Sequence, residues 1–259
     1  FKMIKRVISA LMIAVLAFSV CSCGKSDGVA KTGVTINVYN WGENISDGTD
    51  GTLDVVAQFE KETGIEVNYI TYPTNEEMYN KLKTGGVSYD VVIPSDYMIG
   101  RMIKEDMLAK LNFDNIPNYS LIDDKYKSGD AAAHDPTCEY SVPYSSGRVG
   151  LVYNPEYITE EVDSWDILWD EKYKGNILMF DNPRDAFGIA QLSLGLSLNT
   201  EDKAELQKAA DKLKAQKSVN PVYAMDQIME KMPNEEAYVA PYYVGDCLTM
   251  YNDAIEYDT

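Results

Sequence analysis

The sequence predicts an α/β protein of two lobes. From position 34 to 143, segments with the pattern of strands alternate with segments that have apolar residues at helical spacing, which is typical of a lobe built on a mainly parallel sheet. A second alternation runs from position 144 to 259. Between them the chain becomes extended and passes through Ser145-Ser146-Gly147, where we place the crossover from the first lobe to the second.

The first lobe begins with a buried strand at Thr35–Trp41. The apolar residues between Leu53 and Phe59 then fall close to helical spacing, and Gly64 stands where a C-cap glycine belongs. Asn75 can cap the next helix. The full order we expect is a strand at 35–41, a helix ending at Gly64, a strand at 65–72, a helix from Asn75 to Gly85-Gly86, a strand at 89–94, a helix at 97–105 and an apolar segment at 107–111.

The second lobe repeats this alternation. A charged helix at 201–216 turns Leu206, Ala209, Ala210 and Leu213 inward. The other expected elements are a strand at 149–154, a helix from Ser164, a strand at 176–180, a helix at 183–198, a short helix at 224–232, a strand at 237–242 and a helix that begins at Gly245.

The N-terminus predicts export. Three basic residues precede the apolar run Val7–Val20, which suits a secretory signal better than a membrane span. The run ends in a sequence that resembles a lipobox, with small Ser22 before Cys23. We therefore expect a signal peptide at 1–22, lipidation of Cys23 and a flexible tether at 23–33; an uncleaved signal anchor is the alternative.

The mature chain is strongly acidic. Loss of residues 1–22 removes three positive charges and moves the formal net charge from −18 to about −21. Such a surface repels nucleic acid and is compatible with cationic ligands, although solubility alone also explains it. Nineteen tyrosines against six phenylalanines supply aromatic area with polar tips.

The composition offers little for catalysis or for metal binding. His134 is the single histidine and lies in a polar stretch, and the sequence contains no nucleophile elbow and no Cys/His metal spacing. We expect no enzyme, no cofactor and no metal. Cys138 and Cys247 remain outside the signal and the lipobox, either as free thiols or as a disulfide whose geometry the sequence does not fix.

Several motifs make the chain similar to a known family. They include Asn37–Glu43 (NVYNWGE), Asn75–Leu82 (NEEMYNKL), Tyr89–Ser95 (YDVVIPS), Tyr140–Tyr144 (YSVPY) and Ser164–Trp169 (SWDILW). These stretches resemble the spermidine/putrescine-binding proteins of bacterial polyamine importers, and the similarity extends from Thr35 to about Tyr251.

The resemblance implies a two-lobed periplasmic-binding-protein fold of type II, with the ligand in the interlobe cleft. It also implies a monomer, anchored by lipid to the outer face of the cell membrane or periplasmic, that passes a polyamine to an ABC permease. Members of the family continue beyond the position that matches Thr259 and bring further ligand residues, so we expect the chain to lack the C-terminal part of the fold.

In the first lobe, the resemblance assigns the ligand to two loops. An amine needs a flat apolar surface for its methylenes, and carboxylates or aromatic faces for each ammonium. Trp41 and Glu43 supply both in one loop, and Ser95 and Tyr97 match a second loop. The alternatives are a core tryptophan with a solvated glutamate, and a serine that caps the next helix.

In the second lobe, the resemblance assigns Asn182, Asp185 and Tyr243 to the ligand. Asp185 keeps an acid where the family usually has Glu, Asn182 replaces an acid, and Tyr243 stands where Trp is common. The alternative is that Asn182 caps a helix with Pro183 in its first turn and that Asp185 complements the helix dipole.

Other functions remain open. Relatives of this fold bind thiamine, sugars or iron, and a surface lipoprotein of this fold need not serve transport. A sugar site would also use Trp and Tyr, but it would have less need of Glu43 together with Asp185.

Overall fold

A computed structural model describes residues 29–257 of the chain, so the predicted signal peptide and Cys23 lie outside the described residues. Two compact units divide the chain. The first unit comprises residues up to Val38, Ile45–Ile70 and Tyr89–Val91, and the second comprises Tyr39–Asn44, Thr71–Ser88 and Val92 onward. All seven predicted ligand residues belong to the second unit. The predicted lobe boundary after position 143 stays a prediction.

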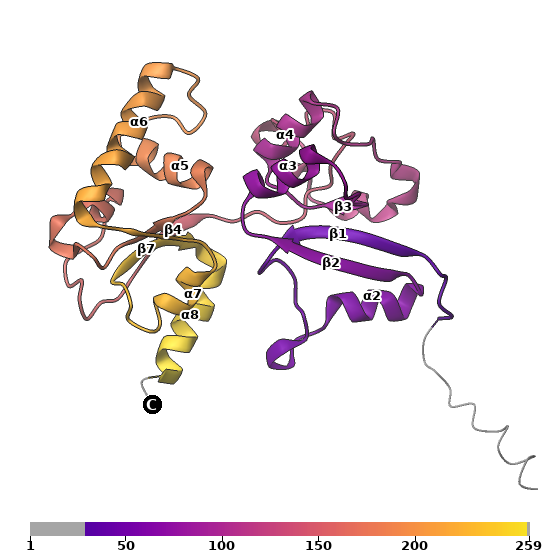
Figure 1. The fold of residues 1–259 in the computed structure, drawn as a ribbon, viewed down its shortest axis with the longest axis horizontal. Coiled ribbons are helices and arrows are strands. Elements are labelled where there is room, and N and C mark those ends of the chain that lie inside the picture. Colours follow the sequence, from indigo (N-terminus) through magenta and orange to yellow (C-terminus); the bar gives the residue numbers. More distant parts are fainter. Residues whose placement is uncertain (1–28, 258–259) are drawn as a thin grey trace, which may run out of the picture. The chain divides into compact units, whose positions relative to one another are not determined.

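The N-terminal half contains a three-stranded sheet in the order β2-β1-β3. Strand β1 spans Thr35–Trp41, as predicted, and the unit boundary crosses it. Helix α2, Val55–Thr63, lies beside β1 and β2 (Figure 1). It begins where the Asp54 side chain accepts a hydrogen bond from the N–H of Ala57, and it ends at Gly64 with φ 71°, the left-handed conformation that glycine adopts without strain.

The other elements of this half are shorter than predicted or begin at another residue. Thr74, not Asn75, caps helix α3, because its hydroxyl accepts from the N–H of Glu77. No helix or strand forms at 107–111. The bounds are β2 Glu66–Tyr72, α3 Asn75–Thr84, β3 Val91–Val92 and α4 Asp96–Lys104, followed by 3-10 turns at Phe113–Asn115, Pro117–Leu121, Asp124–Tyr126 and Gly129–Ala132.

The C-terminal half contains two strand pairs. Strands β4 (Val149–Tyr153) and β7 (Val239–Tyr243) are antiparallel, with Leu151 opposite Pro241. Strands β5 (Leu178–Phe180) and β6 (Val222–Ala224) are parallel, and the sequence reading missed β6. A parallel bridge between Ile177 and Val239 joins the two pairs.

Helices cover both sides of these strands. In Figure 1, α5 and α6 lie on one side of β4 and β7, and α7 and α8 lie on the other. All three residues of β5 are therefore buried and apolar, as expected of a strand covered on both faces. The helices span Pro183–Ser193 (α5), Lys203–Ala215 (α6), Gln227–Lys231 (α7) and Val244–Tyr257 (α8), and 3-10 turns at Trp165–Trp169, Glu171–Tyr173 and Gln216–Val219 complete this half.

Two further predictions concern the segment after Ser164 and the two cysteines. The segment after Ser164 is a 3-10 turn rather than an α-helix, although the Ser164 side chain caps it as expected. Cys138 and Cys247 are both free thiols, so the open question of a disulfide is resolved in favour of unpaired cysteines. Within residues 29–257, no helix has the length and apolar composition that crossing a membrane requires.

Candidate ligand-binding site

Asp185 lies in the first turn of α5 and is half-buried. Asn182 caps this helix: its Oδ1 accepts from the N–H of Arg184, and its Nδ2 donates to Asp185 Oδ2 at 3.0 Å. Both ends of the Asn182 amide are thus engaged, and the side chain is 2% exposed. The capping role that the sequence left open for Asn182 is present, and the cap also orients the Asp185 carboxylate.

Tyr243, the last residue of β7, joins this arrangement. Its hydroxyl donates to Asp185 Oδ2 at 2.8 Å, and its ring centroid lies 5.2 Å from that of Phe180. Burial, followed by the Asp185 charge, raises the pKa of Tyr243, so the phenol keeps its proton and remains a donor at neutral pH.

Burial also raises the pKa of Asp185, and the charge of Glu76 adds to this shift. The hydrogen bond from Tyr243 and the charge of Arg184 oppose it. Because both hydrogen bonds to Asp185 reach Oδ2, its Oδ1 receives none from the described residues.

Ser95 and Tyr97 lie at the start of α4. Ser95 stands at the N-cap position, but its hydroxyl makes no capping hydrogen bond; its N–H donates to Asn75 Oδ1 at 3.2 Å. The Tyr97 hydroxyl accepts from Asn75 Nδ2 at 2.9 Å and donates to Glu76 Oε1 at 3.2 Å. Fully buried Asn75 therefore holds both predicted residues to the first turn of α3.

Tyr97 lies within electrostatic range of Asp185. Burial raises the pKa of Tyr97, and the negative charges of Glu76 and Asp185 both contribute. The Arg184 guanidinium lies 5.6 Å from the centroid of the Tyr97 ring. The structure thus brings together Tyr97, Asn182, Asp185 and Tyr243, and it adds Asn75 and Glu76, which the sequence analysis had included in a family motif and a helix but had not assigned to the ligand.

Trp41 and Glu43 adjoin a different set of carboxylates. The Trp41 ring is half-buried, 4.9 Å from the ring of Tyr72. A methyl group on Gly42 would come within 2.8 Å of Asp226 Oδ2, so only glycine permits this approach. Burial, and then the charges of Glu43 and Asp246, raise the pKa of Asp226.

The carboxylates form two groups. We call Glu76 and Asp185 the Asp185 group, and Glu43, Asp226 and Asp246 the Asp226 group. Tyr243 lies within electrostatic range of both, because Asp185 and Asp226 each raise its pKa. Burial raises the pKa of Asp246 too. The sequence analysis did not identify Asp226.

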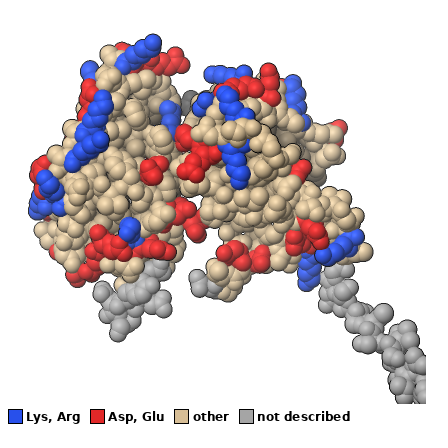
Figure 2. All heavy atoms as spheres, viewed as in Figure 1, with Lys and Arg blue, Asp and Glu red and all other residues tan. Residues whose placement is uncertain are grey.

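None of these five carboxylates forms a salt bridge within the described part of the chain. Elsewhere, cations accompany many of the acidic groups, as Figure 2 shows for red groups that have blue ones beside them. In residues 29–257, moreover, no cluster of three or more His, Cys, Asp or Glu side chains has the arrangement of a metal site.

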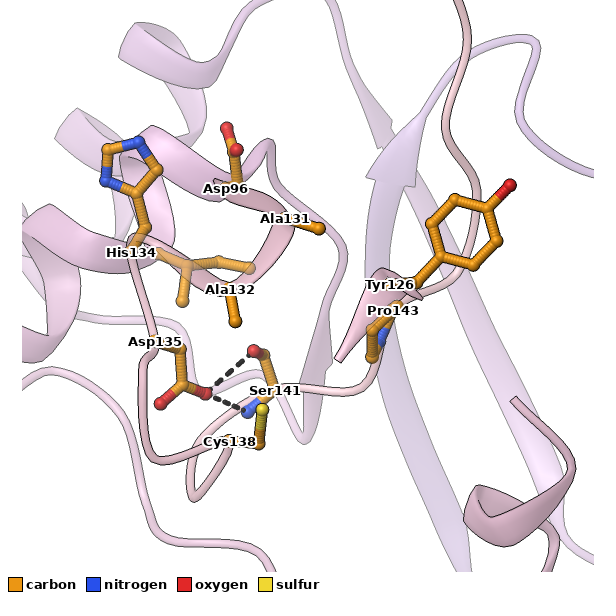
Figure 3. A pocket seen from close by; sticks show the side chains of 10 residues that line it. Asp96, Tyr126, Ala131, Ala132, His134, Asp135, Cys138, Ser141 and Pro143 are labelled. Carbon is orange, nitrogen blue, oxygen red and sulfur yellow. Dashed lines mark hydrogen bonds between the residues drawn. The ribbon is translucent and has the colours of Figure 1, made fainter. Parts of the chain in front are cut away.

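A separate small pocket lies beside α4 (Figure 3). Its lining includes His134, Cys138 and Asp135, and none of the seven predicted ligand residues. Asp135 is buried, and its carboxylate accepts from the N–H and the hydroxyl of Ser141, at 3.0 and 2.8 Å, and from the N–H groups of Glu139 and Tyr140. These bonds satisfy the carboxylate and fix the loop that follows it, which is a structural role.

Comparison with known proteins identifies the family of the chain. The family described as bacterial extracellular solute-binding protein matches residues 54–256. The chain belongs to this family. It is a family of solute-binding transport proteins rather than of enzymes, and the α/β architecture is that of its type II fold.

Relatives in the family carry polyamine names. The spermidine/putrescine-binding periplasmic protein of Escherichia coli is 37% identical over 201 residues, which are 77% of this chain and 55% of that protein. The chain thus spans little more than half of this relative's length. The solved spermidine/putrescine substrate-binding protein PotD of Streptococcus pneumoniae is 34% identical, with a TM-score of 0.59 over 85% of this chain and 65% of that one. The TpPotD lipoprotein of Treponema pallidum is 27% identical, with a TM-score of 0.72 over 85% and 68%.

Proposed function

We propose that the protein captures a polyamine, putrescine or spermidine, and passes it to an ABC permease. The observation that carries this proposal is the pairing of two carboxylate groups, both without a cationic partner among the described residues, with aromatic side chains. A polyamine is an organic chain with an ammonium at each end, so one ligand can neutralise both groups. The names of the relatives support the same ligand class.

Each part of the ligand has a matching surface in this proposal. An ammonium of the polyamine neutralises the Asp185 group, and another neutralises the Asp226 group. A charge-assisted hydrogen bond contributes about 1.5–3 kcal/mol, and an ammonium over an aromatic face about 0.5–2 kcal/mol. Trp41, Tyr97 and Tyr243 supply the aromatic faces, Ser95 stands at the N-cap position before Tyr97, and Asn182 orients the Asp185 carboxylate. A neutral sugar can donate hydroxyl hydrogen bonds to carboxylates, but it brings no positive charge to neutralise five of them.

We also propose the cellular setting that the sequence predicts. The chain is exported, is anchored to the membrane through lipid on Cys23, and acts as a monomer beside its permease. Replacement of Cys23 by alanine then releases the protein from the membrane fraction of expressing cells. Retention of the Cys23→Ala variant in that fraction would contradict the lipid anchor and leave the ligand proposal intact.

A thermal-shift panel tests the ligand class. The protein is melted with putrescine, spermidine, thiamine or maltose, each at increasing concentration. A ligand that binds only the folded state raises the melting temperature progressively as its concentration exceeds Kd. We expect this shift with a polyamine alone. A shift with thiamine or maltose and none with either polyamine would keep the fold and refute the proposed ligand.

A further inference from the structure

Glu76, in the first turn of α3, has a carboxylate oxygen that is buried and has no hydrogen-bond partner. This atom is Oε2, and it receives no donor from the residues that the structure describes. The other oxygen, Oε1, accepts from the Tyr97 hydroxyl at 3.2 Å. A carboxylate oxygen that has lost water without gaining a donor is costly, so its position calls for an explanation.

The role of Glu76 in its own helix does not explain this burial. An acidic side chain in the first turn interacts favourably with the helix dipole, but it does so equally well when it is solvated. The neighbouring Glu77 has the same advantage and is exposed. The helix dipole explains why an acidic residue stands near this end of α3, but it does not explain why Oε2 of Glu76 is buried.

A second carboxylate, that of Asp185, also has an oxygen that receives no hydrogen bond from the described residues, although that oxygen is not buried. The negative charge of Glu76 contributes to the raised pKa of Asp185, and both charges contribute to that of Tyr97. Asp185 uses only Oδ2 for its hydrogen bonds with Asn182 and Tyr243. Two carboxylates from two different helices thus each have an oxygen without a donor.

No cation of the described chain forms a salt bridge with either carboxylate. Arg184 is the nearest candidate because its charge lowers the pKa of Asp185. Its Nη2, however, donates to Asn199 Oδ1 at 3.2 Å, and its guanidinium lies over the Tyr97 ring. It forms no salt bridge with either carboxylate in residues 29–257.

From these contacts we infer that Glu76 binds the ligand directly: its Oε2 and Asp185 Oδ1 together accept hydrogens from one terminal ammonium of the polyamine. Tyr97 holds Oε1 and so directs Oε2 toward the ligand. A primary ammonium has three donors, enough for both carboxylates and one further contact. This inference rests on the proposed function, and it assigns to Glu76 the preference for a ligand with a charged end.

The test compares Glu76→Gln with Glu77→Gln, which removes the same charge from an exposed side chain one residue away. Calorimetry measures Kd for putrescine and for 4-aminobutan-1-ol, in which a hydroxyl replaces one ammonium. We expect E76Q to weaken putrescine binding at least tenfold, in line with one charge-assisted hydrogen bond. We expect E77Q to stay within about twofold of wild type, since exposed charges are screened.

The ratio of the two Kd values separates ligand contact from a structural role. If Glu76 receives the ammonium, E76Q reduces the preference of the protein for putrescine over the amino alcohol. A variant that is merely less stable would weaken both ligands equally, and that result would overturn the inference. If the wild-type protein binds putrescine and the E76Q variant binds it with the same Kd, the inference would be overturned as well.

Two controls keep the outcomes distinct. Glu76→Asp keeps the charge but withdraws it by one methylene, and we expect it to fold and to bind putrescine more weakly than wild type; unchanged binding would count against the inference. If the wild-type protein binds neither amine, the proposed function itself fails, which differs from a wild type that binds and an E76Q variant that binds equally well.

Discussion

Replacing Asp185 by asparagine is expected to change ligand binding and ligand-free stability in opposite directions. The substitution keeps the size of the side chain and an oxygen that can accept from Tyr243, but it removes the charge. In wild type that side chain is half-buried and lies within electrostatic range of Glu76, with no salt bridge among the described residues. The folded protein therefore holds an unneutralised carboxylate that the ligand would neutralise.

The size of the binding effect follows from the contact that is lost. Asp185 offers Oδ1 to the ligand, and a hydrogen bond to a charged group contributes about 1.5–3 kcal/mol. Asp185→Asn should therefore weaken putrescine binding roughly 10- to 150-fold.

The stability effect has the opposite sign. The pKa of Asp185 is raised on folding above its usual value of 3.8. The folded state then binds the proton more tightly than the unfolded state, so this group makes the ligand-free protein less stable as pH rises through the folded pKa. At neutral pH that cost is fully present, and the asparagine variant, which lacks it, should melt at a higher temperature than wild type. Near pH 3.8 the difference in melting temperature between the variant and wild type should shrink.

The assay measures the melting temperature without ligand at neutral and acidic pH, and the Kd for putrescine at neutral pH. Asp181→Asn is the matched control, since Asp181 is an exposed carboxylate just before the same helix. If Asp185→Asn melts below wild type at neutral pH, the carboxylate is stabilised by groups of the protein. If its Kd equals that of wild type, Asp185 does not contact the ligand. Either result would refute the reasoning for this residue.

Three further predictions concern the same site. Asn182→Ala removes the cap of α5 and should cost about 1 kcal/mol of stability, so its melting temperature should fall where that of Asp185→Asn rises; equal shifts would argue against the separate roles. Gly42→Ala places a methyl group 2.8 Å from Asp226 Oδ2 and must displace that carboxylate. We expect calorimetry to show putrescine binding weakened roughly fivefold, about 1 kcal/mol. An unchanged Kd would show that putrescine binding does not depend on the position of the Asp226 carboxylate. Burial raises the pKa of Asp185, Asp226 and Asp246, so each regains its proton at a higher pH than an ordinary aspartate. Putrescine affinity should accordingly decline as the pH is lowered from neutral, starting at a higher pH than ordinary aspartates would give, and an affinity that stays constant down to the usual aspartate range would contradict the use of these charges.

The local elements of the fold could be read from the sequence because short-range chemistry determines them. The strand at Thr35–Trp41 follows from its apolar pattern, and the end of α2 follows from the need for a left-handed residue at Gly64. The cap of α3 was placed one residue late because Thr74 and Asn75 are both good caps, and only the hydrogen bond to Glu77 distinguishes them. Strand β6 was missed because it has only three residues, too few for an alternating pattern to show.

The site was predictable only in part, for a related reason. Asp185 and Tyr243 were predicted separately from family motifs, and the hydrogen bond between them joins residues 58 positions apart. Glu76 stood within a motif that had been noted, but its helical position does not reveal that one of its oxygens is buried. Asp226 had no motif at all, and only the close approach of Gly42 identifies it. Residues that act through distant contacts need the folded chain to be recognised.

Calorimetric titration with putrescine and with 1,4-butanediol tests the central claim most directly. The two molecules share a four-carbon chain, and they differ in whether their ends are ammonium or hydroxyl groups. If carboxylates without cationic partners in the described chain form the site, putrescine should bind saturably at a ratio of one to one, and the diol should give no measurable binding. Equal binding of the two, or binding of neither, would contradict the account.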